Sequence, residues 1–183
     1  MKKLYAKLLI FLIIQPVLAQ EKIAFDSANP FNFRDVIVNL DKQESQAVFG
    51  LLNIPETSTE NTKFPLIIAF AGSKGWAEHH LEYIQMYHEM GIATFEVKSF
   101  ESRNVTSTVG SQIAVTTAMM ILDSYKALEV LSNHPRINSK KIAITGWSLG
   151  GGVALYSGWK PLIHAINPTN SFAAHLSFYP PCI

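Results

Sequence analysis

The segment Gly146-Trp147-Ser148-Leu149-Gly150 has the residue types and spacing of a turn that presents a nucleophile. The apolar run Ile142–Thr145 before it predicts a buried strand, and the small residues after Gly150 predict a helix. In such a nucleophile elbow the serine backbone is strained, and side chains two residues before or after it would collide with their neighbours. Ser148 is therefore a candidate nucleophile. The alternative is an ordinary glycine-rich turn.

A serine hydroxyl becomes a good nucleophile when a histidine takes its proton and a carboxylate orients that histidine. No Asp or Glu follows Glu129, so the acid is absent from its usual place after the serine. His164 follows the serine too closely, and we expect His175 to be a core or sheet residue. Of the earlier histidines we expect the first three to lie on a solvated helix: His79, His80, His88 and His134. Adjacent histidines point apart on a helix, so His79 and His80 would make a poor metal site. We expect no metal and no cofactor.

Length and composition predict one globular domain. The chain has 183 residues, of which 48% are hydrophobic and 16% charged, and its formal net charge is +1. This near-neutral balance gives no reason to expect nucleic acid or an anionic surface as a partner.

The first nineteen residues have the features of a signal peptide. Three lysines precede the apolar run Leu8–Leu18, and Val17-Leu18-Ala19 offers small residues at a cleavage site after Ala19. An uncleaved anchor is the alternative, but the run is shorter than a membrane span and is interrupted by Gln15-Pro16. We therefore expect a periplasmic or secreted protein without stable membrane insertion after cleavage.

The remaining pattern alternates strands and helices. We predict helices around 81–90 and 111–132, and strands over Phe33–Val38, Gln46–Pro55, Phe64–Phe70, Ile92–Val97, Ile142–Thr145 and Phe172–Tyr179. The first two strands form an antiparallel hairpin, after an extended lead-in over 20–30. This order predicts a doubly wound α/β fold with a mostly parallel sheet.

The chain resembles the dienelactone hydrolase family of α/β-hydrolases over about residues 35 to 183. The resemblance rests on the elbow, the loop Ala71–Gly75, the segment His134-Pro135-Arg136-Ile137 after the long helix, and the ending Phe178-Tyr179-Pro180-Pro181. It implies a serine hydrolase that cleaves a small-molecule ester or lactone. Ser148 matches the nucleophile position, where several members carry cysteine.

The resemblance also implies which groups stabilise the oxyanion. One donor is the N–H of Leu149, directly after the nucleophile, and the second is a backbone N–H of the loop Ala71–Gly75, for which Ser73 is the candidate. Dienelactone hydrolases place a carboxylate-binding arginine in a loop that matches Arg103 only loosely. A surface or helix-pairing role is the alternative for Arg103. The family's glutamate is missing between Phe70 and Gly75, which argues against dienelactone itself as substrate.

Two hypotheses remain open at this stage. In the first, residues 20–183 are the N-terminal two-thirds of an exported hydrolase, whose acid and histidine lie past Ile183; the sheet is then incomplete at its C-terminal edge. The unpaired Cys182 fits this expectation, because its partner would lie there too. We expect negligible turnover by these residues alone. In the second, the protein is a truncated, non-catalytic relative. A propeller-bearing peptidase is excluded by length.

Overall fold

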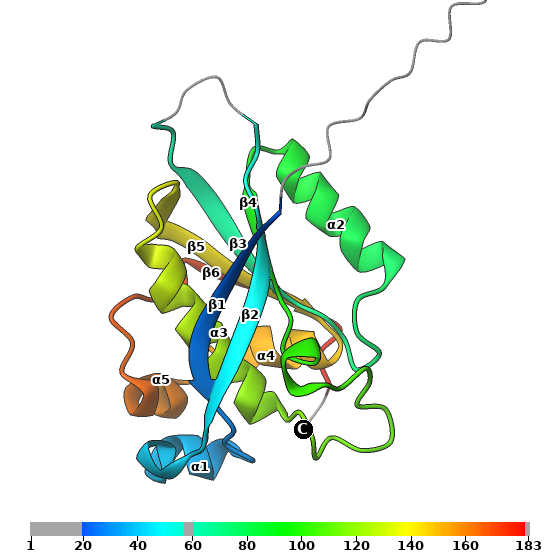
Figure 1. Cartoon of the computed structure of the whole chain (residues 1–183), viewed down its shortest axis with the longest axis vertical. Helices are drawn as coiled ribbons and strands as arrows, with labels where there is room; N and C mark the ends of the chain where they lie inside the picture. The colour runs from blue at the N-terminus through cyan, green and yellow to red at the C-terminus, as the bar shows by residue number, and fades with distance from the viewer. Residues whose placement is uncertain (1–19, 57–60, 182–183) are drawn as a thin grey trace, which may run out of the picture.

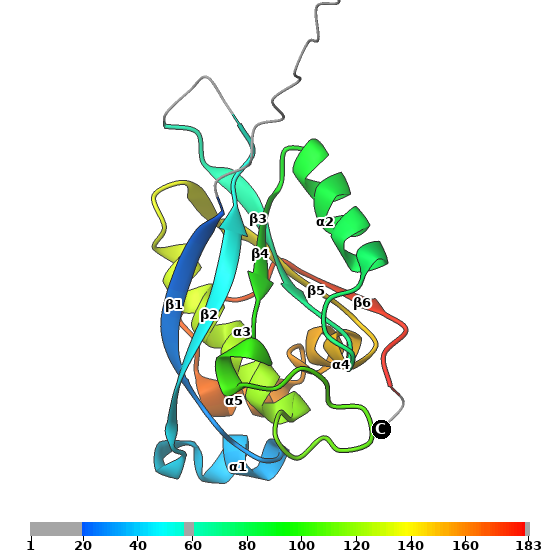
Figure 2. The ribbon, with the colours of Figure 1, turned by 45° about the vertical axis from the view of Figure 1, so that its right-hand side comes forward.

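The computed structural model describes residues 20–56 and 61–181, and Figures 1 and 2 show its central sheet. The sheet contains six strands in the order β1-β2-β4-β3-β5-β6. Strand β2 pairs antiparallel with β1 and β4, whereas β4-β3, β3-β5 and β5-β6 are parallel pairs. The strands are β1 (Glu21–Ala28), β2 (Ser45–Asn53), β3 (Phe64–Phe70), β4 (Ala93–Val97), β5 (Ile137–Trp147) and β6 (Ala174–Phe178). The predicted α/β fold with an antiparallel hairpin at its start is confirmed.

Helices cover both faces of this sheet. Helix α2 packs on one face against β4, and α3 and α4 pack on the other against β5 (Figure 2). Short helices α1 and α5 contact each other at one end of the molecule (Figure 1). The helices are α1 (Phe33–Val38), α2 (Glu78–Glu89), α3 (Thr117–Ser132), α4 (Leu149–Tyr156) and α5 (Lys160–Ile166), with 3-10 turns η1 (Leu40–Lys42) and η2 (Glu101–Arg103).

The central strands are apolar because helices cover both of their faces. In β3, Leu66, Ile67 and Ile68 are buried, and Ile142 and Ile144 are buried in β5. The larger apolar cluster lies between the sheet and α3, and a small one of Ala69, Ile84 and Trp147 lies under α2. The continuous hydrophobic runs of the sequence therefore identified these strands correctly.

The prediction for Phe33–Val38 was wrong, because this segment is helix α1. Asn32 caps it: its side chain accepts the N–H of Asp35 at 3.0 Å, and the Asp35 carboxylate accepts the N–H of Asn32 at 3.2 Å. This reciprocal pair is a capping box, which favours a helix start over a strand. The partner of β2 in the hairpin is instead β1, in the segment expected to be a lead-in.

Two other boundaries differ from expectation. Helix α3 begins at Thr117, six residues later than predicted, because the Thr116 side chain accepts the N–H of Met119 at 3.2 Å and caps the helix there. The segment after α4 contains the unpredicted helix α5. None of the helices in the described part of the chain is long and apolar enough to cross a membrane. The predicted signal peptide and Cys182 lie outside the described residues.

Candidate active site

Ser148 lies on the turn between β5 and α4 in a strained conformation. Its φ is 54° and its ψ −114°, in a region that residues other than glycine rarely occupy. Strain of this kind persists where the surrounding structure enforces it, and it is concentrated at functional sites. The Ser148 N–H donates to the Phe178 carbonyl at 3.0 Å, and the Ser148 carbonyl accepts the N–H of Gly152 at 3.0 Å. The turn is therefore fixed on both sides.

The glycines of the motif are required by close backbone contacts. A Cβ at Gly146 would collide with the carbonyl of Gly150, and a Cβ at Gly150 would collide with the carbonyl oxygens of Phe70 and Ala71. The elbow thus packs directly onto the end of β3. This contact brings the loop after β3 beside Ser148, as the sequence pattern predicts.

The loop Ala71–Gly75 is held by its own turn and by a distant segment. Gly75, with φ of 80°, donates its N–H to the Gly72 carbonyl at 2.9 Å. Since the Gly72 carbonyl and the Ser73 N–H share one planar peptide, this bond also fixes the direction of the Ser73 N–H. The Ser73 carbonyl accepts the Thr108 N–H at 2.8 Å and the Ser107 hydroxyl at 3.1 Å.

Two backbone donors near Ser148 remain available. Among the described residues, the N–H groups of Ser73 and Leu149 have no hydrogen-bond acceptor. Leu149 is the first residue of α4, where helical N–H groups lack partners inside the helix. Neither candidate oxyanion donor therefore gives its N–H to another described residue. Leu149 lies in the elbow and Ser73 in the loop after β3, and these two backbone segments meet at Gly150.

Arg103 lies in a buried ion pair. Its guanidinium contacts the Asp123 carboxylate through two nitrogens, at 2.8 and 3.0 Å. The same side chain donates to Asn29 at 2.9 Å, Ser99 at 3.1 Å and Ala28 at 3.3 Å. These five bonds use all five of its N–H donors. This arrangement favours a structural role over the alternative of binding a substrate carboxylate.

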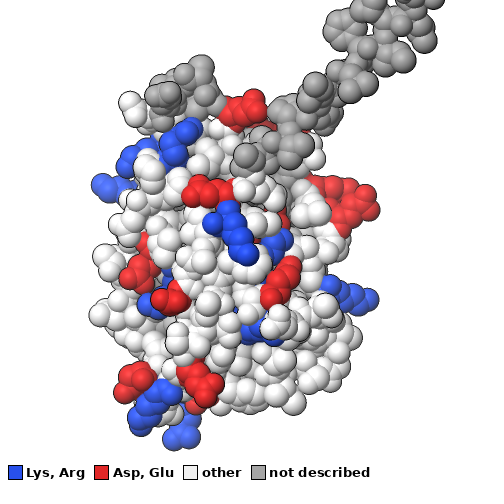
Figure 3. Space-filling model, in the orientation of Figure 1, with Lys and Arg blue, Asp and Glu red and all other residues white. Residues whose placement is uncertain are grey.

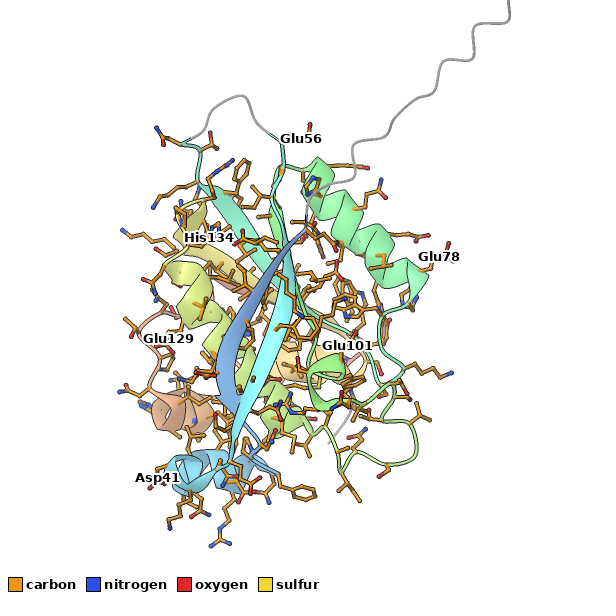
Figure 4. All side chains as sticks on the ribbon, viewed as in Figure 1. Asp41, Glu56, Glu78, Glu101, Glu129 and His134 are labelled. Atoms are coloured by element: carbon orange, nitrogen blue, oxygen red, sulfur yellow. The ribbon has the colours of Figure 1, made fainter. Side chains whose placement is uncertain are left out.

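The histidines after Ser148 lie away from any carboxylate. His175 is part of β6, as expected, and its Nδ1 contacts the Ala154 carbonyl at 2.8 Å. His164 is exposed on α5. Within 20–56 and 61–181, the one histidine–carboxylate contact is His134 with Glu21, at 3.3 Å. In the view of Figure 4, His134 and Glu101 appear on opposite sides of β1 and β2. No triad is therefore assembled among the described residues.

One prediction near Ser148 was wrong, because His80 does not lie on a solvated surface of its helix. It is 4% exposed rather than solvated, and its ring stacks on Trp147 at 4.7 Å. Its Nδ1 accepts the N–H of Ala77 at 3.1 Å, which satisfies a donor at the start of α2. Burial, and secondarily the neighbouring His79, lowers the pKa of His80 from 6.5 to about 4. His79, in contrast, is exposed as expected. The two rings do not point apart as expected, because their centroids lie 4.1 Å from each other.

This pKa predicts an acid-sensitive contribution to stability. Because the unfolded chain binds a proton at His80 below pH 6.5 while the folded protein resists it down to about pH 4, stability falls as the pH drops through this window. We expect a loss of up to about 1 kcal/mol per pH unit. Urea unfolding at neutral and mildly acidic pH measures it. His80→Gln should shrink the difference and His164→Gln should not; equal pH dependence in all three proteins would contradict the prediction.

Two hollows lie on different sides of the elbow helix. One, of about 290 Å³, borders the Ser73 loop and is lined by Lys74, Trp76, Lys98 and Glu101 among others. A more apolar one, of about 590 Å³, lies at the far end of α4 beside Leu155 and Trp159. The first is lined by Lys74 and Gly75 of the loop that contains Ser73, and neither hollow is lined by Ser148 itself. Charges of both signs are interspersed on the face shown in Figure 3.

The described residues contain no group of His, Cys, Asp or Glu able to hold a metal.

Comparison with solved structures identifies the class of protein. A protein from Klebsiella pneumoniae assigned as a dienelactone hydrolase matches 89% of this chain with a TM-score of 0.54 and 14% identity. A dienelactone hydrolase-like promiscuous phosphotriesterase from metagenomic libraries matches 75% of it, with a TM-score of 0.53 and 15% identity. The chain spans 62% and 53% of these two proteins. The fold is thus that of the dienelactone hydrolase-like α/β-hydrolases, and the resemblance seen in the sequence is confirmed.

The sequence places the chain in a particular family of this class. The family model for acetyl xylan esterase (AXE1) matches residues 38–179. The chain therefore belongs to the acetyl xylan esterase (AXE1) family, which is a family of ester hydrolases. No curated protein matches it closely enough to be counted as a relative.

Proposed function

We propose that this protein is an exported serine hydrolase that cleaves carboxylic esters through an acyl-enzyme on Ser148. The observation that carries the proposal is the strained Ser148 turn, with the unpaired N–H groups of Leu149 and Ser73 beside it. Membership of an esterase family supports the ester as the bond that is cleaved.

The chemistry follows from these groups. Ser148 Oγ attacks the ester carbonyl, and the carbonyl oxygen becomes an oxyanion that accepts hydrogen bonds from Leu149 and Ser73. The C–O bond to the alcohol then breaks, and the alcohol leaves with a proton. Water attacks the acyl-enzyme, releases the acid and returns the proton to Ser148. Each oxyanion donor contributes about 3 kcal/mol of transition-state stabilisation. No cofactor is needed.

The proton acceptor for Ser148 is a separate part of the proposal. In this fold the acid and the histidine of a triad follow the nucleophile in the chain. The segment after Ser148 offers His164 and His175 but no Asp or Glu. Since the chain spans 62% of the length of a protein that shares its fold, we place the acid and histidine in the portion that it does not span.

The proposed substrate is a small ester or lactone. The family description suggests acetyl groups on xylan, a polymer that an exported enzyme would meet outside the cytoplasm. Export itself rests on the predicted signal peptide at residues 1–19. N-terminal sequencing of the mature protein, which should begin at Gln20, tests this step.

Trapping of the serine tests the proposed nucleophile. Incubation of the full-length protein with a fluorophosphonate, followed by peptide mass spectrometry, should label Ser148 and leave the exposed Ser171 unlabelled. Labelling elsewhere, or none, would favour the alternative of a non-catalytic protein with this fold. That alternative is supported by one observation: no described histidine contacts a carboxylate near Ser148.

A further inference from the structure

Four aromatic side chains connect the start of α2 to the residues around Ser148. His80 stacks on Trp147 with an interplanar angle of 24° and a centroid distance of 4.7 Å. The Nε2 of His79 contacts the Tyr179 hydroxyl at 3.1 Å. We name His79, His80, Trp147 and Tyr179 the histidine cluster. Trp147 directly precedes Ser148, and Tyr179 follows the residue whose carbonyl binds the Ser148 N–H. The cluster therefore joins the start of α2 to β5, which leads into the elbow, and to the end of β6, which accepts the Ser148 N–H.

Within this cluster, His80 is held in one tautomer. Its Nδ1 accepts the N–H of Ala77, so the proton of the neutral ring lies on Nε2. A protonated ring would place an N–H of His80 against that of Ala77, and this contact would be lost. Burial, which lowers the pKa of His80 to about 4, keeps the ring neutral near pH 7.

The ring also lies close to the meeting point of the two donor segments. A Cβ added to Gly72 would lie 3.5 Å from Ser148 Cβ and 3.9 Å from His80 Cε1. The space at Gly72, between Ser148 and the His80 imidazole, would therefore hold little more than one methyl group. The N–H of Ser73 belongs to the peptide that Gly72 begins, so any shift of the loop relative to His80 moves this donor.

We propose that His80 is a positioning residue that sets the separation of the Ser73 and Leu149 N–H groups. It does so by holding Ala77 at the end of the loop while its ring packs on Trp147 at the end of β5. The role of the two donors rests on the proposed function. Groups that stabilise a transition state must be held within about 0.5 Å of their productive geometry, and residues in contact with their supports provide this.

Two variants separate the two contacts of His80. His80→Phe keeps a ring on Trp147 but cannot accept from Ala77, and His80→Gln keeps an acceptor, as in a capping box, but loses the ring. His164→Gln on α5 is the matched control. Nitrogen NMR of the full chain should show His80 with its proton on Nε2. Amide exchange at Gly75 should become about tenfold faster in both variants, and exchange at Ala77 should do so in His80→Phe, which lacks the acceptor, while the amides of β1 and β2 stay unchanged.

A proton on Nδ1, or unchanged exchange in the loop, would overturn the proposal, and so would an equal change throughout the chain. Kinetics of the full-length protein with p-nitrophenyl acetate add an independent result. If His80 positions the donors, kcat should fall about tenfold and KM should stay within about twofold. Faster loop exchange with unchanged kcat would reject the positioning role. Turnover that does not depend on Ser148 would instead reject the proposed function, and amide exchange would still decide whether His80 holds the loop.

Discussion

Ser148→Ala is expected to lower the hydrolysis of p-nitrophenyl acetate by the full-length protein about 10⁴-fold or more. Without Oγ no acyl-enzyme forms, and the remaining oxyanion donors can only assist the direct attack of water. The rate of p-nitrophenol release under saturating ester measures the effect. Ser171→Ala, at an exposed position after α5, is the control and should retain full activity.

The strain at Ser148 provides a second measurement on the same residue. Glycine adopts a φ of 54° without penalty, whereas serine does not. Ser148→Gly should therefore be inactive yet more stable by about 1 kcal/mol, while Ser148→Ala should be inactive and unchanged in stability. Unfolding in urea distinguishes them. Retained activity in either variant would refute Ser148 as the nucleophile, and equal stability of all three proteins would refute the strain.

The site was predictable where the sequence pattern is local. The elbow combines an apolar strand, a serine and glycines at fixed spacing. Each glycine is required because a side chain there would collide with the backbone of a neighbouring element. The buried strands β3 and β5 were equally evident, because a strand covered on both faces is apolar throughout. Both parts depend on short stretches of chain, which a single sequence displays.

The hairpin shows how a local signal can be misread. The apolar residues of Phe33–Val38 suggested a strand, but Asn32 and Asp35 stand at the spacing of a capping box, and this signal determined the structure. The strand pattern of β1 was weaker, because β1 is an edge strand with several exposed positions.

Tertiary contacts were beyond prediction. His80 is buried because Trp76, which lies before the start of α2, and Trp147, which is distant in the sequence, cover it. Likewise, nothing local marks Asp123 as the partner of Arg103, since the pair forms when β1, η2 and α3 pack together. A polar residue in the otherwise apolar stripe of a long helix is the one clue that the sequence offered for Asp123.

Asp123→Ala is expected to destabilise the protein by about 3–5 kcal/mol. The carboxylate has no exposed surface and accepts four hydrogen bonds: from Ser27 at 2.6 Å, from Ser99 at 2.7 Å, and from Arg103 at 2.8 and 3.0 Å. Its removal leaves the Arg103 guanidinium, itself 4% exposed, without a counter-charge. Such an unpaired buried charge is much more destabilising than the loss of a surface ion pair. The free energy of unfolding in urea measures the effect.

Lys126→Ala is the matched control, because this lysine on the same helix forms an exposed ion pair with Glu129 at 3.2 Å. Its loss should change stability by no more than about 0.5 kcal/mol. Asp123→Asn, which keeps the shape but removes the charge, should fall between the two. A loss below about 1 kcal/mol for Asp123→Ala would show that the pair is dispensable. A large loss would show that α3, β1 and η2 are joined by one buried charge pair, next to the segment that holds the Ser73 loop.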